Sequence, residues 1–71
     1  MNKFTQPLTE MTSREKTILS LIGEGNSNKQ IAKMLNLAEC TITTYTINIF
    51  RKLNVNNRTH AVAIAIKNKL I

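Results

Sequence analysis

Apolar residues near the start of the chain recur at the spacing of an α-helix. Ile18, Leu19 and Ile22 fall on one helical face, and "TSRE" at residues 12–15 comes shortly before them. A Ser or Thr followed three residues later by Glu forms a capping box, in which each side chain pairs with a backbone N–H that the first turn leaves free. Because the glycines of "GEGN" then end the periodic run, the pattern predicts a helix over residues 12–24.

The same signature predicts a second, shorter helix. "SNKQ" at residues 27–30 is again a capping box, and Ile31, Ala32 and Leu35 follow it at helical spacing. The small side chain of Ala32 on the inward face would let another helix cross closely. "LNLAE" then makes a tight connector without glycine or proline.

The segment "ECTITTYTINIFRKL" at residues 39–53 is ambiguous, because its many β-branched residues favour a strand. A strand would alternate, yet Ile42 and Tyr45 lie three residues apart and would fall on opposite faces. Wound as a helix, these two residues join Ile49 and Leu53 in a single stripe, and tertiary packing commonly overrides a modest cost in helix propensity. The pattern therefore predicts a helix. The residues that face away from its apolar stripe are Thr43, Thr44, Ile47 and Arg51.

The last segment, "HAVAIAIKNKLI", also alternates like a strand, but its regularly spaced alanines favour a helix. Asn57, in the turn before it, can cap that helix. One apolar stripe, formed by Ala61, Ile64 and Ala65, can enter the core, whereas a second stripe needs a partner. The second stripe consists of Val62, Ala63, Ile66 and Leu70.

These elements predict an all-α, four-helix domain over residues 11–71, preceded by a flexible arm at residues 1–10 that contains Pro7. A chain of 71 residues makes one domain, and a domain of this size is marginal without a disulfide, a metal or a partner subunit. One cysteine excludes an internal disulfide, and one histidine beside it cannot complete a four-ligand zinc site. Helix packing and oligomerisation are therefore the expected sources of stability.

The charge balance points to a polyanionic partner. Ten Lys and Arg against four Asp and Glu give a formal charge of +6, and nucleic acid is the commonest polyanion. An anionic membrane is the competing partner, but no apolar run approaches the ~20 residues of a spanning helix and no signal-peptide pattern opens the chain. The single thiol fits a reducing compartment. We expect a cytoplasmic domain that uses no membrane, small-molecule ligand, cofactor or metal.

Residue types that carry catalysis are scattered, so no enzyme is expected. The chain has no glycine-rich phosphate loop and no cluster of His and carboxylates, and it is too short to wall off a pocket. Cys40 lies near the start of the helix at residues 39–53, where the helix dipole could lower the thiol pKa and make a redox switch. A small residue at the solvent edge is the simpler interpretation.

A short helix, a tight turn and a second helix between capped helices make a helix-turn-helix domain. The motifs "TSREK", "SNKQIA" and "KLNVNNRTHAV" together resemble the LuxR/GerE-type DNA-binding domain of bacterial transcription regulators of the FixJ and NarL kind. The resemblance covers residues 11–71. It implies that the helix at residues 39–53 is a recognition helix lying in the major groove, and that the last helix forms a dimer interface. In this family such domains often follow a receiver or sensor domain, although some stand alone.

The expected recognition helix departs from the family pattern. Family members usually have Ser, Lys and His where this chain has Ala38, Thr43 and Tyr45, and basic residues are also common at the position of Ile47. The usual N-cap of this helix and its lysine contacts to guanine and phosphate are therefore missing.

This uncharged face predicts a preference for an A·T-rich inverted repeat, because methyl groups suit the C5-methyl of thymine and a Thr hydroxyl can pair with several base edges. The expected base contacts are Thr43, Thr44, Ile47, Asn48 and Arg51. The expected phosphate contacts are Ser27, Asn28, Lys29, Lys33, Thr41, Tyr45 and Lys52. The expected homodimer interface is Val62, Ala63, Ile66 and Leu70.

Two alternatives stay open. The uncharged face could bind a protein instead, so that the chain pairs with a related regulator without touching DNA. RNA binding has less support, because sequence-specific RNA readers stack bases on exposed aromatics and this chain has only one Tyr and two Phe.

Overall fold

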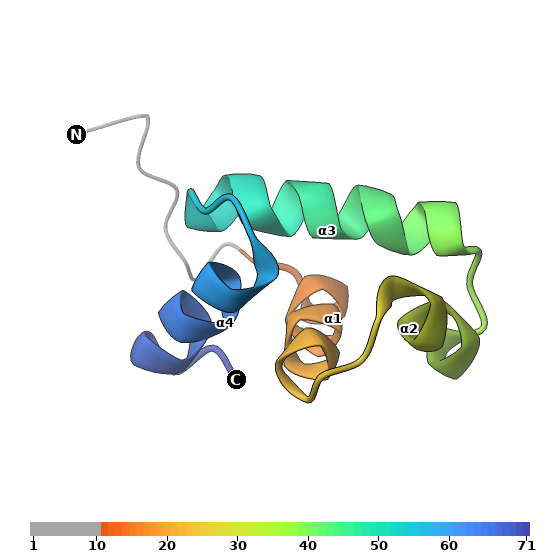
Figure 1. The fold of residues 1–71 in the computed structure, drawn as a ribbon, viewed down its shortest axis with the longest axis horizontal. Coiled ribbons are helices and arrows are strands. Elements are labelled where there is room, and N and C mark those ends of the chain that lie inside the picture. The colour runs from red at the N-terminus through yellow and green to blue at the C-terminus, as the bar shows by residue number, and fades with distance from the viewer. Residues whose placement is uncertain (1–10) are drawn as a thin grey trace.

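Four helices and no strand make up the secondary structure of residues 11–71, the part of the chain that the computed structural model describes. In chain order they are α1 (Ser13–Gly23), α2 (Asn28–Leu35), α3 (Glu39–Leu53) and α4 (Arg58–Lys67). The longest helix, α3, extends across the molecule and packs on each of the other helices (Figure 1). The predicted all-α, four-helix fold is confirmed. The predicted arm at residues 1–10 lies outside the described residues.

Both predicted capping boxes start their helices. Thr12 Oγ1 accepts a hydrogen bond from the Glu15 N–H at 3.1 Å, and Glu15 Oε1 accepts one from the Thr12 N–H at 2.9 Å. Ser27 and Gln30 exchange the equivalent bonds at 3.1 Å and 2.7 Å. After α1, Gly25 takes a φ of 94°, a conformation that glycine adopts without steric cost. The boundaries of α1 and α2 therefore follow from local sequence.

Asparagine, not glycine, ends the two helices of the helix-turn-helix. Asn36 after α2 and Asn54 after α3 both take the left-handed conformation, with φ of 58°. Asn tolerates this conformation better than most residues, so the chain turns tightly without glycine. Asn57 caps α4 as predicted, by accepting the His60 N–H at 2.8 Å. At the start of α3, Ala38 makes no side-chain cap bond.

The core joins the inward stripes of the helices, and small residues let the helices approach. Ala32 on α2 and Ala61 and Ala65 on α4 are buried. On α3, Thr46 is buried, whereas Tyr45 is only partly buried at the edge of the core. The largest fully buried side chains are Ile18, Leu19, Ile31, Ile42 and Ile49.

Threonine hydroxyls in α3 bond back to the helix's own carbonyls, while the burial of Ile42 and Ile49 accounts for the helical state of a segment so rich in β-branched residues. The Oγ1 of Thr43, Thr44 and Thr46 donates to the carbonyl four residues earlier, at 3.1, 3.1 and 2.9 Å. These bonds keep the hydroxyls inside the helix's own hydrogen-bonding pattern. The buried hydroxyl of Thr46 therefore has a partner.

The predicted core stripe of α4 enters the core, and part of the second stripe, which was expected to need a partner, packs there as well. Ile64 packs against the core beside the buried alanines. The second stripe is divided: Val62 and Leu70 also lean on the core, while Ala63 and Ile66 face outward, Ile66 with 60% of its surface exposed. Leu70 lies beyond the last helical residue, because α4 ends at Lys67. No helix within residues 11–71 combines the length and apolar character needed to cross a membrane.

Ala38→Ser is expected to stabilise the fold by about 1 kcal/mol. Ala38 already has the extended backbone of an N-cap, with φ of −70° and ψ of 147°, but it offers no side-chain oxygen to the first-turn N–H groups of α3. The free energy of unfolding, measured by urea denaturation, should rise in this variant. Ala38→Val, which adds bulk without an acceptor, is the control. Equal stabilities for the two variants would contradict the assignment of a missing cap.

Candidate nucleic-acid interface

The outward face of α3 presents uncharged side chains along its first turns. Thr43 and Thr44 are exposed, and Ile47 is 51% exposed despite being wholly apolar. Arg51 is exposed one turn further on, and the half-buried Asn48 lies between. Helical spacing brings these predicted base-contact residues onto one flank of α3. The flank is apolar and hydroxylated at its start and carries amide and guanidinium groups at its end.

The side chain of Asn28, the first residue of α2, contacts α3. Its Nδ2 lies 3.5 Å from Thr43 Oγ1, and its Oδ1 lies 3.3 Å from Thr46 Oγ1. Arg58, the first residue of α4, donates to Asn28 Oδ1 at 2.8 Å and to the Asn26 carbonyl at 2.6 Å. Asn28, predicted as a phosphate contact, therefore has its side chain occupied inside the protein. Arg58 was not predicted as a site residue. The only indication in the sequence is that it is a cation next to Asn57, the cap of α4.

The other predicted phosphate contacts differ in whether their donor groups are exposed or already hydrogen-bonded within the protein. Lys29 and Lys33 are exposed on α2. Ser27 uses both its hydroxyl and its N–H in the capping box, and the Thr41 N–H donates to the Ala38 carbonyl at 3.0 Å. At the start of α2 the backbone N–H groups of residues 28 and 29 precede the first intrahelical bond, so they lack a helical partner.

Tyr45 lies at the edge of this flank. It is partly buried, as expected for an aromatic residue that packs on the core. Together with Thr41, Thr44 and Asn48 it lines a shallow hollow of about 370 Å³. The ring is thus placed beside the exposed face and not at its centre.

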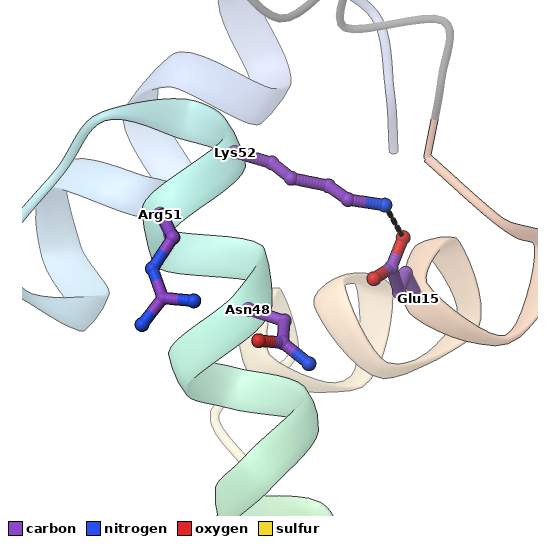
Figure 2. A pocket seen from close by; sticks show the side chains of 4 residues that line it. All are labelled: Glu15, Asn48, Arg51 and Lys52. Carbon is purple, nitrogen blue, oxygen red and sulfur yellow. Dashed lines mark hydrogen bonds and ion pairs between the residues drawn. The ribbon is translucent and has the colours of Figure 1, made fainter.

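An ion pair ties the end of α3 to the start of α1 (Figure 2). Lys52 Nζ lies 2.7 Å from Glu15 Oε1, and the side chains are 28% and 7% exposed. The pair borders an open hollow of about 350 Å³ that Asn48 and Arg51 also line. Lys52, predicted as a phosphate contact, therefore shares its ammonium group with a carboxylate of the same chain.

The Glu15 carboxyl group is held in its charged form. Burial raises its pKa, but hydrogen bonds from Lys52 and the Thr12 backbone, together with the Lys52 charge, outweigh that effect. The pKa of Glu15 consequently lies below its ordinary value of 4.5. The same carboxylate closes the capping box of α1 and anchors α3.

The remaining reactive side chains form no cluster. Cys40 is an exposed free thiol in the first turn of α3, in keeping with the simpler interpretation of a small residue at the solvent edge. Among residues 11–71, no three His, Cys, Asp or Glu side chains come together where they could hold a metal ion.

Comparisons with known proteins agree with this architecture. The family model for bacterial regulatory proteins of the luxR family matches residues 9–65. The chain is 41% identical over 66 residues to the transcriptional regulatory protein DegU of Brevibacillus brevis, covering 93% of this chain and 28% of DegU. It is 42% identical over 59 residues to the DNA-binding transcriptional activator DevR/DosR of Mycobacterium tuberculosis, covering 83% and 27%.

A solved structure gives the same result for the fold. The response regulator ChrA of a heme-sensing two-component system superposes with a TM-score of 0.86 at 38% identity, covering 92% of this chain and 32% of ChrA. The chain thus spans less than a third of the length of these three relatives. The matching family consists of regulatory proteins and not of enzymes, in agreement with the sequence prediction.

The free energy of unfolding is expected to fall as the pH decreases below about 4.5, because the pKa of Glu15 is lower in the folded than in the unfolded chain. The unfolded chain then takes up the proton first, and the stabilisation present at neutral pH is lost as the pH falls through the folded-state pKa. Urea denaturation between pH 7 and pH 3 measures this.

Glu15→Gln should lower the free energy of unfolding at pH 7 by about 2 kcal/mol, because the Lys52 ammonium loses a charged partner. Its stability should also vary less with pH than that of the wild type. Glu24→Gln removes an exposed carboxylate at the end of α1 and serves as the control. Parallel pH profiles for the wild type and Glu15→Gln would rule out the assignment.

Proposed function

The chain belongs to the LuxR family of bacterial regulatory proteins, and on this basis we propose that residues 11–71 form a domain that binds double-stranded DNA and regulates transcription. The observation that carries the proposal is the exposed flank of α3. Asn28 of α2 donates to Thr43 on this flank, and Arg58 of α4 in turn donates to Asn28. The formal charge of +6 supports a polyanionic partner. If the partner is chromosomal DNA, we expect the protein in the bacterial cytoplasm.

In this proposal α3 is the recognition helix and enters the major groove, which is wide enough for an α-helix. Its exposed flank faces the base edges, and the methyl groups at its start favour an A·T-rich site. The proposed base contacts remain Thr43, Thr44, Ile47, Asn48 and Arg51.

Affinity would come from the phosphates on either side of the groove. Lys29 and Lys33 are the exposed cations of α2, and the free N–H groups at the start of α2 add neutral donors. Lys52 is a weaker candidate than its charge suggests, because Glu15 binds its ammonium group at 2.7 Å. An ammonium has three N–H donors, so Lys52 still has donors for a phosphate.

Dimerisation through α4 would place two copies of α3 in successive major grooves of an inverted repeat, about one helical turn apart. Ala63 and Ile66 supply the exposed centre of this proposed interface, and Val62 and Leu70 flank it.

A protein-interaction domain is the second candidate, in which the chain pairs with a related regulator and does not touch DNA. The observation that favours it is the 51% exposure of Ile47 on a flank where Thr43 replaces the usual lysine. The same flank would then pack against a protein.

Fluorescence anisotropy of a labelled A·T-rich duplex tests the two candidates. With about five phosphates neutralised, the logarithm of the association constant should fall against the logarithm of salt concentration with a slope of about −4 to −5. Lys29→Gln and Lys33→Gln should each reduce the slope by about one, because each removes one phosphate contact. An absence of binding even at low salt would contradict the DNA-binding proposal and favour the protein-interaction domain.

Ile66→Glu is expected to make the protein monomeric and to weaken binding to a two-half-site duplex, because it places a charge at the centre of the proposed α4 interface. Thr17→Glu, an exposed site on α1, adds the same charge and is the control. Sedimentation velocity reports the oligomeric state, and anisotropy reports the binding. A dimer that survives Ile66→Glu would exclude this interface.

A further inference from the structure

The first turns of the α3 flank have already used their strong hydrogen-bond donors. A hydroxyl group carries one proton, and those of Thr43 and Thr44 are donated to the carbonyls of Glu39 and Cys40 at 3.1 Å each. Ile47, the next exposed residue on the flank, has no polar atom in its side chain. Within the flank only the weak S–H of Cys40 remains, so this part of the flank offers methyl groups and acceptor oxygens. The Thr41 and Tyr45 hydroxyls lie beside it, at the hollow that Thr44 borders.

Thr43 is held in this state from two sides. Its oxygen donates to the Glu39 carbonyl and also lies 3.5 Å from Asn28 Nδ2. Arg58 fixes which way the Asn28 amide points, because its guanidinium donates to Asn28 Oδ1 at 2.8 Å and thereby directs the NH₂ group toward Thr43. Turning the Thr43 hydroxyl toward a base would break its bond to the carbonyl. Thr43 therefore presents its methyl group to a ligand.

The four bases differ in how they match such a surface. Thymine presents its C5-methyl group in the major groove, and the amino groups of adenine and cytosine can donate to the Thr44 oxygen. Guanine presents only acceptors, N7 and O6, which would lose water and gain no donor here. An unpaired polar group buried in an interface is costly. The surface thus favours thymine and disfavours guanine.

We propose that the flank of Thr43, Thr44 and Ile47 recognises thymine through its C5-methyl group and disfavours guanine as the base that it contacts directly. This inference rests on the proposed function and deepens it by naming the chemical group that is read. The flank is also directional: Asn48 and Arg51 bring amide and guanidinium donors at its far end. Each half-site should therefore tolerate guanine at the end that these two residues cover.

The test uses the whole chain and a duplex selected from a random library. Thymines of the selected site are replaced one at a time by uracil, which removes only the methyl group, and binding is measured by anisotropy at one salt concentration. At each contacted position the affinity should fall about fourfold, as expected for one buried methyl group. Thymines outside the half-sites should show no change. Methylating a cytosine at a contacted position, to give 5-methylcytosine, should strengthen binding by a similar factor.

Protein variants assign the effect to residues. Ile47→Ala should bind thymine and uracil equally at the position that Ile47 covers, while Thr44→Val, which keeps a methyl group and loses the oxygen, should keep the wild-type preference for thymine there. Thr43→Lys adds a donor and should raise the affinity for duplexes that carry guanine opposite the start of α3.

Two results would overturn the inference separately from the proposed function. If the protein binds its selected duplex but every uracil substitution is neutral, or if the selected site has guanine opposite the start of α3, DNA binding stands and methyl recognition fails. If no duplex binds even at low salt, both fail together.

Discussion

Burial of Ile42 and Ile49 against the other helices fixes the rotation of α3, and the rest of the structure depends on that rotation. Both side chains are fully buried, and Leu53 continues the same stripe. A helix with one buried stripe must expose the opposite one. The burial that stabilises the core therefore also determines that Thr43 and Ile47 face outward. Fold and candidate interface are two consequences of one packing choice.

Rotation alone would not prevent α3 from sliding along its axis, and two polar anchors limit that movement. Lys52 joins the end of α3 to Glu15 on α1, and Asn28 joins the first half of α3 to the starts of α2 and α4 through Thr46 and Arg58. Ionic and hydrogen-bonding contacts are directional, whereas isoleucine packing is not. Within residues 11–71 every buried side-chain nitrogen or oxygen has a hydrogen-bond partner. The interface is thus supported by a core without unpaired polar groups, a condition for holding side chains in one arrangement.

The sequence could predict what depends on neighbours along the chain and could not predict what depends on distant pairs. Capping boxes and the Asn57 cap are local, so the starts of α1, α2 and α4 were predictable. The Lys52–Glu15 and Arg58–Asn28 contacts join residues 37 and 30 positions apart, and no periodic pattern encodes them. The sequence therefore predicted Lys52 and Asn28 as phosphate contacts without indicating that each also has a partner within the chain. The hydrogen bond from the Thr43 hydroxyl to the Glu39 carbonyl could not be predicted either, because the partner of a hydroxyl group is defined only in the folded helix.

The uncharged start of the α3 flank has a consequence for how base discrimination would arise in the proposed function. Phosphate contacts raise affinity for all sequences alike, so at the start of the flank, before Asn48 and Arg51, selectivity would come from weak methyl contacts. One buried methyl group is worth about fourfold in affinity, and three such contacts in a half-site would give about sixty-fold. That falls short of the roughly 10³-fold or greater preference of specific DNA-binding proteins. Two half-sites multiply their preferences to about 4,000-fold, which reaches that range. In the proposed function, methyl contacts alone would therefore need a second copy of the chain to reach this range, and the exposed Ile66 on α4 is where that copy would bind.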